Sequence, residues 1–327
     1  MKPTIDKLFI ASIKQFLTQA QQNVLKQVNY IMVQTYFELG KQIIEHEQKG
    51  KNEANYGTYL LEELSINLTK EFGKGFSKRN LELIRKFYIS YRFAKSTISQ
   101  SLSWTHYIQL MRIDNEDERS FYQIESQTNN WSVRELSRQI NSDLYNRLLL
   151  SKDKNKVINL ALKGQIIEKP IDLIKDPYIL DFLNLPEKST YSETDLEQAL
   201  IDKIEHFLLE LGKGFTFVGR QVRLTFDEEH FKVDLVFYNR LLRCFVLIDL
   251  KIGKLKHQDL GQMQMYVNYY DRYVKTKDEL PTIGIILCKD KKDTLVEITL
   301  PKDNKQIFAS KYLLYLPKET ELKQLIK

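Results

Sequence analysis

The hydrophobic periodicity of the chain changes once along its length, and this change limits the folds available to it. From Ile10 to about Leu150 the apolar residues recur every three or four positions, as on one face of an α-helix. From Thr194 onward a helical pattern is followed by runs rich in apolar and β-branched residues, and a further helical pattern separates the last two. These runs are FTFVGRQVRLTF, FKVDLVFY, CFVLIDLK and TIGIILC. The sequence therefore predicts an α+β protein, in which an all-helical N-terminal domain precedes an α/β domain.

The chain divides into three parts where this pattern breaks. Its 327 residues are enough for two domains that each bury a core. The stretch 151–190 begins with a lysine-rich run and contains Pro170, Pro177 and Pro186, so it is interpreted as a connecting segment. We therefore expect a helical domain at 1–150 and an α/β domain at 191–327.

Composition and charge narrow the classes of function. The sequence contains no run of about 18 apolar residues, so we expect a cytoplasmic protein without a membrane partner. The 49 Lys and Arg residues exceed the 43 Asp and Glu residues by six, which suits a polyanionic partner such as nucleic acid. Cys244 and Cys288 lie in apolar strand patterns and are expected to be buried free thiols.

The strand patterns bring three charged residues close together. In CFVLIDLK, Asp249 and Lys251 are two positions apart, so their side chains point to the same face of a strand. Asp234 lies in the middle of FKVDLVFY, and the short connection between the two runs predicts an antiparallel hairpin. Asp234 and Asp249 are thus expected on adjacent strands. The structural alternative for Asp249 and Lys251 is an ion pair at a strand end.

Two neighbouring carboxylates indicate a divalent cation. They repel each other unless a cation lies between them, and hard oxygen ligands favour Mg²⁺ or Mn²⁺. Such an ion can bind a scissile phosphate and lower the pKa of a water that attacks the phosphorus. Lys251 is expected to orient that water or to neutralise the charge that develops on the phosphate.

The helix expected from Asp195 to Leu211 contains a third candidate carboxylate. Glu197 falls near the centre of its apolar stripe, which favours a role at the metal. Alternatively, Thr194 and Glu197 form a capping box at the start of the helix, and Glu205 is then the reserve candidate. Gln262, on the helix expected after the strand of Asp249 and Lys251, is a further candidate for the same site.

The order of these elements resembles the PD-(D/E)xK nuclease superfamily: a helix with Glu, a strand with Asp, a strand with D-x-K, and a helix that opens with GQ. More narrowly, DLEQALIDKIEHFLLELGKGFTFVGRQ, DLVFY and LIDLKIGKLKHQDLGQMQMYVNYYDR resemble the YhcG-like family, which joins such a nuclease domain to a helical N-terminal domain. This resemblance implies Glu197, Asp234, Asp249 and Lys251 as the active site, with Gln262 as an accessory residue. It further implies Asp234, Asp249 and Glu197 as metal ligands, with Asp249 standing where many relatives carry Glu.

The N-terminal half contains two helix starts that favour DNA contact. One follows a turn at Gly73 to Gly75 and has Ser77 as its N-cap, which makes a helix-turn-helix plausible. In WSVRELSRQI, Ser132 and Glu135 are expected to form a capping box, Trp131 and Leu136 a hydrophobic staple, and the arginines to project outward. The stretch from SLSWTHYIQLMRI to NNWSVRELSRQI also resembles the helix-turn-helix region of ParB-type DNA-binding proteins. The candidate DNA-binding residues are Lys78, Arg79, Arg85, Arg134 and Arg138. A solvated basic surface or a protein-docking module is the alternative.

These features together predict a metal-dependent endodeoxyribonuclease that its helical domain targets to DNA. Family resemblance alone associates it with genome defence or mobile-element biology, where partner proteins and a homo-oligomer are compatible with the sequence. The alternatives are a DNA-binding protein that recognises branched or broken DNA without cutting it, and a nuclease that acts on RNA.

Overall fold

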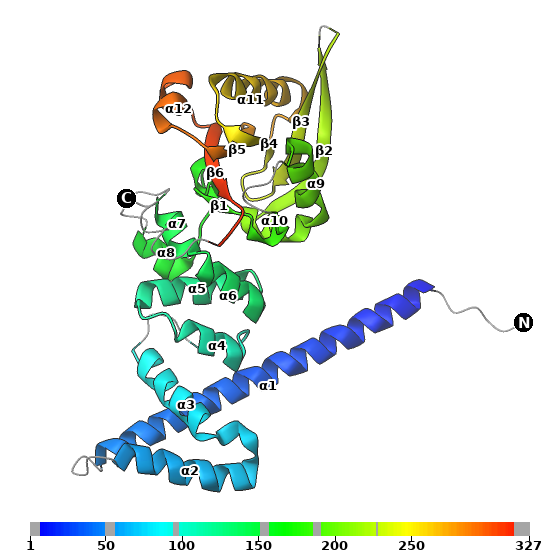
Figure 1. The fold of residues 1–327 in the computed structure, drawn as a ribbon. Helices are drawn as coiled ribbons and strands as arrows, with labels where there is room; N and C mark the ends of the chain where they lie inside the picture. The colour runs from blue at the N-terminus through cyan, green and yellow to red at the C-terminus, as the bar shows by residue number, and fades with distance from the viewer. Residues whose placement is uncertain are drawn as a thin grey trace, which may run out of the picture. The chain divides into compact units, whose positions relative to one another are not determined.

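The structure is a computed structural model, and it describes residues 7–49, 56–93, 98–150, 157–185, 191–226 and 228–316 (Figure 1). The chain forms two compact units. The first comprises Met1–Arg138 with Ile158–Gly164, and the second comprises Gln139–Val157 with Gln165–Lys327. No helix among the described residues is both long enough and apolar enough to span a membrane.

The N-terminal half is all helical, as its periodicity predicts. Its elements are α1 (Lys7–Lys49), α2 (Tyr56–Phe72), η1 (Lys74–Phe76), α3 (Lys78–Tyr91), α4 (Trp104–Leu110), α5 (Glu116–Thr128), α6 (Val133–Asn141), α7 (Leu144–Leu150) and α8 (Val157–Lys163). The chain passes from α2 through the single turn η1 into α3, and the Ser77 hydroxyl caps α3 by accepting a hydrogen bond from the Asn80 amide. The helices and the turn expected around Gly73 to Gly75 are therefore confirmed.

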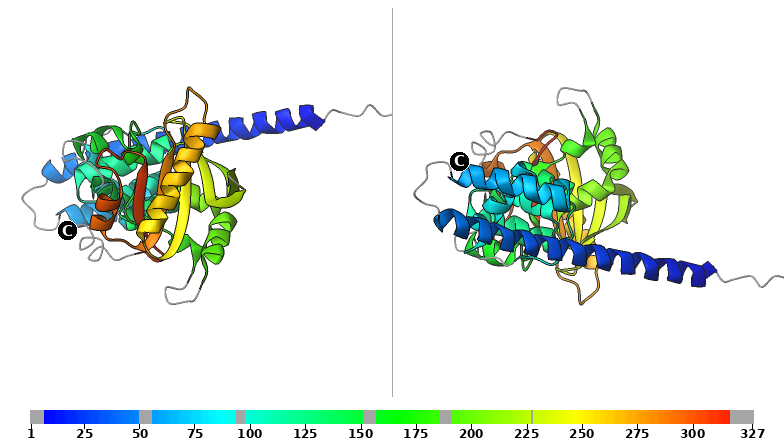
Figure 2. Two further views of the ribbon diagram at one scale, coloured as in Figure 1. Left: turned by 90° about the horizontal axis from the view of Figure 1, so that it is seen from above. Right: turned by 90° about the horizontal axis from the view of Figure 1, so that it is seen from below.

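Helix α1 packs on the rest of the first unit through its second half only. Gly40 permits the close approach of α1 to α3, because a Cβ at this position would lie 2.5 Å from the carbonyl oxygen of Ile84. Val33, Tyr36 and Ile43 are buried beside it. The first half of α1 extends past α2 and α3 in all three views (Figures 1 and 2).

The second unit is built on one mixed sheet, in the order β1-β6-β5-β4-β3-β2. Pairs β2–β3 and β3–β4 are antiparallel, whereas β4–β5, β5–β6 and β1–β6 are parallel. Its elements are η3 (Pro170–Leu173), β1 (Tyr178–Ile179), η4 (Asp181–Leu183), α9 (Glu193–Asp202), α10 (Ile204–Leu211), β2 (Phe215–Phe226), β3 (Glu229–Asn239), β4 (Cys244–Lys254), α11 (His257–Tyr269), η5 (Tyr270–Val274), β5 (Ile283–Asp290), α12 (Asp293–Thr299) and β6 (Ile307–Leu313). All four expected strand runs and the β3–β4 hairpin are confirmed.

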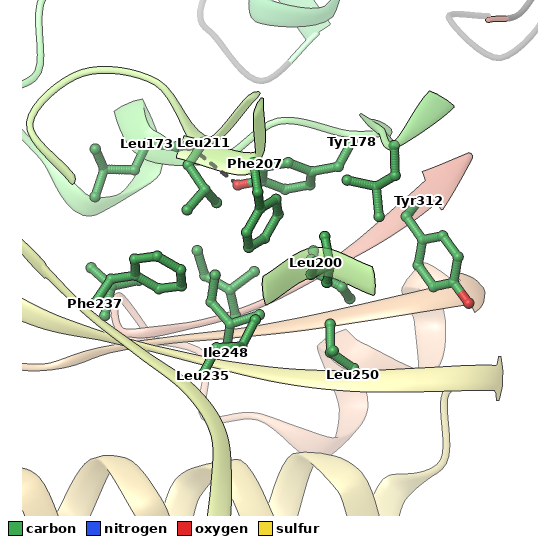
Figure 3. Packing of buried hydrophobic residues seen from close by; sticks show 14 of the residues in the cluster. Leu173, Tyr178, Leu200, Phe207, Leu211, Leu235, Phe237, Ile248, Leu250 and Tyr312 are labelled. Carbon is green, nitrogen blue, oxygen red and sulfur yellow. Dashed lines mark hydrogen bonds between the residues drawn. The ribbon is translucent and has the colours of Figure 1, made fainter. Parts of the chain in front are cut away.

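Helices cover both faces of this sheet. Leu200, Phe207 and Leu211 of α9 and α10 pack against alternate residues of β3 and β4, including Leu235 and Ile248 (Figure 3). On the other face, Met263, Tyr266 and Val267 of α11 pack against residues such as Val236 and Leu247. Cys244 and Cys288 are buried and free, as expected. Residues that alternate along β4 therefore serve two different cores.

A buried ion pair joins the segment after α6 to the second unit. Arg147 and Glu210 are fully buried, and their side chains approach to 2.7 Å. Arg147 also donates to the carbonyls of Ser142 and Pro177, and Glu210 accepts from the amide of Ile179. Burying both charges requires such partners. Residues 139–150, which we expected at the end of the helical domain, therefore lie in the second unit.

The expected connecting segment also contributes structure to the second unit. Its strand β1 pairs in parallel with β6, so Tyr178 lies beside Tyr312 in the register. Residues 151–156 and 186–190, which include the lysine-rich run and Pro186, lie outside the described residues.

Candidate active site

The two candidate aspartates lie where β3 and β4 separate. The β3–β4 ladder ends at the pair Leu235 and Ile248, and continuing this register by one position sets Asp234 opposite Asp249. At this point the Leu250 amide donates a 2.8 Å hydrogen bond to Oδ2 of Asp234. A side-chain carboxylate thus takes the place of a ladder carbonyl. The result is two carboxylates on adjacent strands, as the sequence predicts.

Asp249 is the most perturbed acid of this cluster. Its side chain is almost fully buried, and Oδ2 lies 2.7 Å from Nζ of Lys251. Burial and the charge of Asp234 raise the pKa of Asp249 to about 7, although the Lys251 ammonium acts in the opposite direction. Burial by itself would lower the pKa of Lys251, but attraction to Asp249, Glu193 and Asp234 raises it above its usual value. Lys251 therefore carries its charge at neutral pH.

The start of α9 supplies a carboxylate that sequence reasoning missed. Oε2 of Glu193, the first residue of the helix, lies 3.8 Å from Nζ of Lys251. Its side chain is half-exposed, so this contact is a weak one. No motif in the sequence distinguishes Glu193 from other acidic residues in a first helical turn.

Glu197 is not a capping residue. The N-cap of α9 is Ser192, whose hydroxyl accepts from the Asp195 amide, while Asp195 accepts a 2.8 Å bond from the Ser192 amide. The alternative interpretation, a capping box of Thr194 and Glu197, is therefore wrong, because the helix begins two residues earlier. Glu197 is instead buried on the inward side of α9. Burial and the nearby Asp234 raise its pKa, with a hydrogen bond from Gln221 opposing the shift.

The single helix expected from Asp195 to Leu211 is in fact two. It breaks at Lys203, whose backbone leaves the helical region, and α10 begins at Ile204. Glu205 lies in the first turn of α10 with an exposed side chain. Glu205 therefore lacks the buried environment that distinguishes Glu197.

Gln221 links two of the candidate carboxylates. Its Nε2 donates to Oε2 of Glu197 and, at 3.1 Å, to Oδ1 of Asp234. The register of β2 and β3 sets Gln221 opposite Asp234, and its backbone has a positive φ of 48°. The residue ends the FTFVGRQ stretch on which the family resemblance rests, but nothing in the sequence assigned it a role.

Gln262 contacts the site indirectly. Its Nε2 donates a 2.6 Å hydrogen bond to the hydroxyl of Tyr266, which donates at 2.8 Å to the carbonyl of Lys232. This chain ties α11 to β3 two residues before Asp234. Burial and the charge of Asp249 raise the pKa of Tyr266 to about 12, so its hydroxyl remains a donor at neutral pH.

The donor set fits a divalent cation held by few protein ligands. Within the described ranges, no three His, Cys, Asp or Glu side chains are grouped so that they could hold a metal ion by themselves. Asp234 and Asp249 provide two hard oxygen donors, while Glu197 is joined to Asp234 through Gln221. Mg²⁺ commonly uses one or two carboxylates together with waters and substrate phosphates. The pair therefore suits such an ion better than a site closed by protein ligands.

The candidate basic residues of the helical unit differ in exposure. Lys78 pairs with Glu62, Arg85 pairs with Glu47 at 2.7 Å, and Nη1 of Arg138 lies 3.7 Å from Glu135. The expectation that Arg138 projects outward is wrong, because only 13% of its side chain is exposed. Arg79 and Arg134 are exposed.

The start of α6 is partly as expected. The Ser132 hydroxyl accepts a hydrogen bond from the Glu135 amide, and Trp131 and Leu136 are both buried. Because Arg134 is exposed but Arg138 is largely buried, the outward-facing basic surface of α6 is smaller than its sequence indicates.

The raised pKa of Asp249 predicts a stability change with pH in metal-free protein. Asp249 ionises near pH 4 in the unfolded chain and near pH 7 in the folded one, so stability falls as the pH rises between these values. Between pH 5 and pH 8 in EDTA, we expect the free energy of unfolding to fall by about 2 kcal/mol less in Asp249→Asn than in the wild type. Calorimetry is the suitable measurement, because both tryptophans, Trp104 and Trp131, lie in the helical unit. Identical pH profiles for the variant and the wild type would contradict the burial of this charge.

Comparisons with known proteins identify the family. A model of the DUF1016 N-terminal domain matches residues 12–147, and one of the YhcG PDDEXK nuclease domain matches residues 171–327. The curated protein "Putative nuclease YhcG" of Escherichia coli (strain K12) is 38% identical in an alignment 334 residues long, and the alignment covers 93% of this chain and 88% of that protein.

Solved structures are more distant. They include a repair endonuclease from Pyrococcus abyssi, with 19% identity, a TM-score of 0.26, and coverage of 39% of this chain and 50% of that chain. For an EndoMS–dsDNA2 complex the identity is 18%, the TM-score 0.27, and the coverage 41% of this chain and 49% of that chain. This chain thus spans about half the length of these solved structures. On the sequence matches, the chain belongs to the YhcG family of PDDEXK nucleases, with a DUF1016 N-terminal domain before the nuclease domain.

Proposed function

We propose that this protein is an endodeoxyribonuclease that hydrolyses phosphodiester bonds with Mg²⁺ or Mn²⁺. PDDEXK nucleases typically use divalent metal ions, and the family assignment supports nuclease activity. The observation that carries the proposal is the meeting of Asp234, Asp249 and Lys251 where β3 and β4 separate. A purely structural ion pair at a strand end would not need a second carboxylate opposite Asp249.

Each side chain of the site has a distinct part in this proposal. Asp234 and Asp249 would hold the cation, which would supply Lewis-acid stabilisation of the phosphate and lower the pKa of a water. Lys251, oriented by its 2.7 Å contact with Asp249, offers ammonium protons to the attacking water or to the phosphate oxygens. Glu197 has a raised pKa and is connected to Asp234 through Gln221, so it is suited to accept a proton from water.

Several features favour DNA as the substrate. The net charge of +6 favours a polyanion, and Arg79 and Arg134 are exposed on the helical unit. We propose that this unit targets the enzyme to DNA in the cytoplasm, in genome defence or mobile-element biology. If the helical unit has this role, Arg79→Glu and Arg134→Glu should weaken DNA binding in EDTA and reduce its salt dependence.

Cleavage assays test the proposal directly. Asp249→Ala and Lys251→Ala should each reduce DNA cleavage at least about a hundredfold, because one removes a metal ligand and the other the ammonium beside it. Purified full-length protein should be assayed on supercoiled, linear, branched and single-stranded DNA and on RNA, with Mg²⁺, Mn²⁺ or EDTA. Glu205→Ala is the matched control, because it removes an exposed carboxylate of the same unit.

The outcomes of that assay separate the alternatives. Undiminished cutting by Asp249→Ala would refute the site. Cleavage confined to RNA would refute the DNA substrate, and binding without cleavage under every metal condition would favour a non-cleaving DNA-binding protein.

The bridging role of Gln221 gives a further prediction. In Gln221→Glu a carboxylate replaces the amide that donates to Glu197 and Asp234, so three acidic groups repel one another. We expect cleavage to fall at least tenfold, roughly 1.4 kcal/mol of barrier, with no loss of DNA binding in EDTA. Gln198→Glu makes the same chemical change at an exposed position of α9 and should leave cleavage near the wild-type rate. If both variants cut equally well, Gln221 has no positioning role.

A further inference from the structure

The first half of α1 presents an apolar face that the described part of the unit does not cover. Four residues spaced seven apart form what is called here the α1 seam: Ile10, Leu17, Val24 and Ile31. Their side chains are 41%, 55%, 63% and 51% exposed, respectively. Other exposed apolar residues of the same stretch flank the seam, namely Phe9, Ile13, Phe16, Leu25, Val28 and Met32.

The spacing of the seam is typical of a helix that packs along another helix. Apolar residues repeated every seven positions stay on one side of a helix that coils around a partner. The opposite side of α1 is polar, with Gln15, Gln19 and Lys26 all exposed. Before the point where α1 packs on the rest of its unit, the helix therefore has an apolar side and a polar side.

The exposed area is large enough for a stable interface. Among the α1 side chains that the structure describes, the first buried one is Val33, so the seam lies before the point where α1 packs on α3. With ten seam and flanking side chains per copy and roughly 100 Å² for each, two copies would bury about 2,000 Å², at the upper end of the range for specific protein–protein interfaces. An exposed apolar patch of this extent is uncommon in a monomer.

The seam leads into an apolar groove on the same unit. This groove has a volume of about 780 Å³ and begins at Ile31, the last seam residue. Its apolar lining comes from α1, α2, η1 and the segment before α4: Ile31, Phe37, Leu39, Leu68, Phe72, Phe76 and Ile98. An apolar helix that followed the seam toward the C-terminal end of α1 would therefore reach the groove.

We propose that the occupant is a second copy of this chain, with the two α1 helices crossing antiparallel near Val24. Such a crossing sets residue 24−n opposite residue 24+n, so Leu17 faces Ile31 and Phe9 comes opposite Leu39 in the groove. The acidic residues of α1 lie only in its second half, at Glu38, Glu45 and Glu47, whereas Lys14 lies in the first. Lys14 then comes within one turn of Glu38 of the other copy, which a parallel pair would not allow.

The oligomeric state of the full-length protein tests this interface. Sedimentation equilibrium should give a dimer for the wild type, and Leu17→Asp with Val24→Asp should raise the dissociation constant at least a hundredfold. Because both side chains are exposed within the unit, the double variant should keep its helical content and its calorimetric transitions. Gln15→Asp with Gln19→Asp adds the same charge on the polar side and should remain dimeric. A wild type that is monomeric throughout the concentration range would overturn the proposal, and would leave the seam to a different partner or a lipid surface.

Disulfide trapping tests the orientation. The two native cysteines are buried, so single introduced thiols on α1 can be followed by themselves. Val24→Cys should cross-link two copies under mild oxidation, because this position meets itself at an antiparallel crossing. Ile10→Cys should not, because residue 10 lies opposite residue 38 of the other copy. Cross-linking of both variants would indicate a parallel pair and overturn the groove contact.

Discussion

The hydrogen bond from the Leu250 amide to the Asp234 carboxylate determines how the site is built. It forms at the point where β3 and β4 stop pairing, so a side chain takes over the partner that the backbone of β3 no longer provides. This holds Asp234 against β4 at the level of Asp249 and fixes one oxygen, while Gln221 fixes the other. The cores on both faces of the sheet keep the two strands in this register. The alternation of side chains along β4 then sets Asp249 and Lys251 on the same face of the strand.

Without a metal ion, the charges of these carboxylates lower the stability of the folded protein. Asp234, Asp249 and Glu197 lie around Gln221 and Lys251, and burial is the chief cause of the raised pKa values of Asp249 and Glu197. Lys251 offsets only part of this cost. A cation between Asp234 and Asp249 would offset the remainder, which makes ion binding and substrate phosphate binding properties of the same arrangement. Groups that reduce stability in this way are typical of functional sites.

Much of this arrangement could be predicted from the sequence, and the failures have physical reasons. Local alternation identified β2 to β5, and the D-x-K spacing put Asp249 and Lys251 on one face. The first turn of α9 was ambiguous, because both Ser192 with Asp195 and Thr194 with Glu197 fit a capping box, and only tertiary burial of Glu197 decides between them. Gln221 depends on cross-strand register and a positive φ, and β1 depends on parallel pairing with the distant β6. The buried pair of Arg147 and Glu210, which shifts the unit boundary, is equally non-local.

The central claim is that Asp234 and Asp249 together hold a divalent cation. Its most direct test is a titration of the full-length protein with Mn²⁺, followed by electron paramagnetic resonance of the free ion, which needs no substrate. The wild type should bind Mn²⁺ at pH 7.5, Asp234→Asn should bind it at least tenfold more weakly, and Glu205→Gln should bind it like the wild type. The same titration curve for Asp234→Asn and the wild type would contradict it.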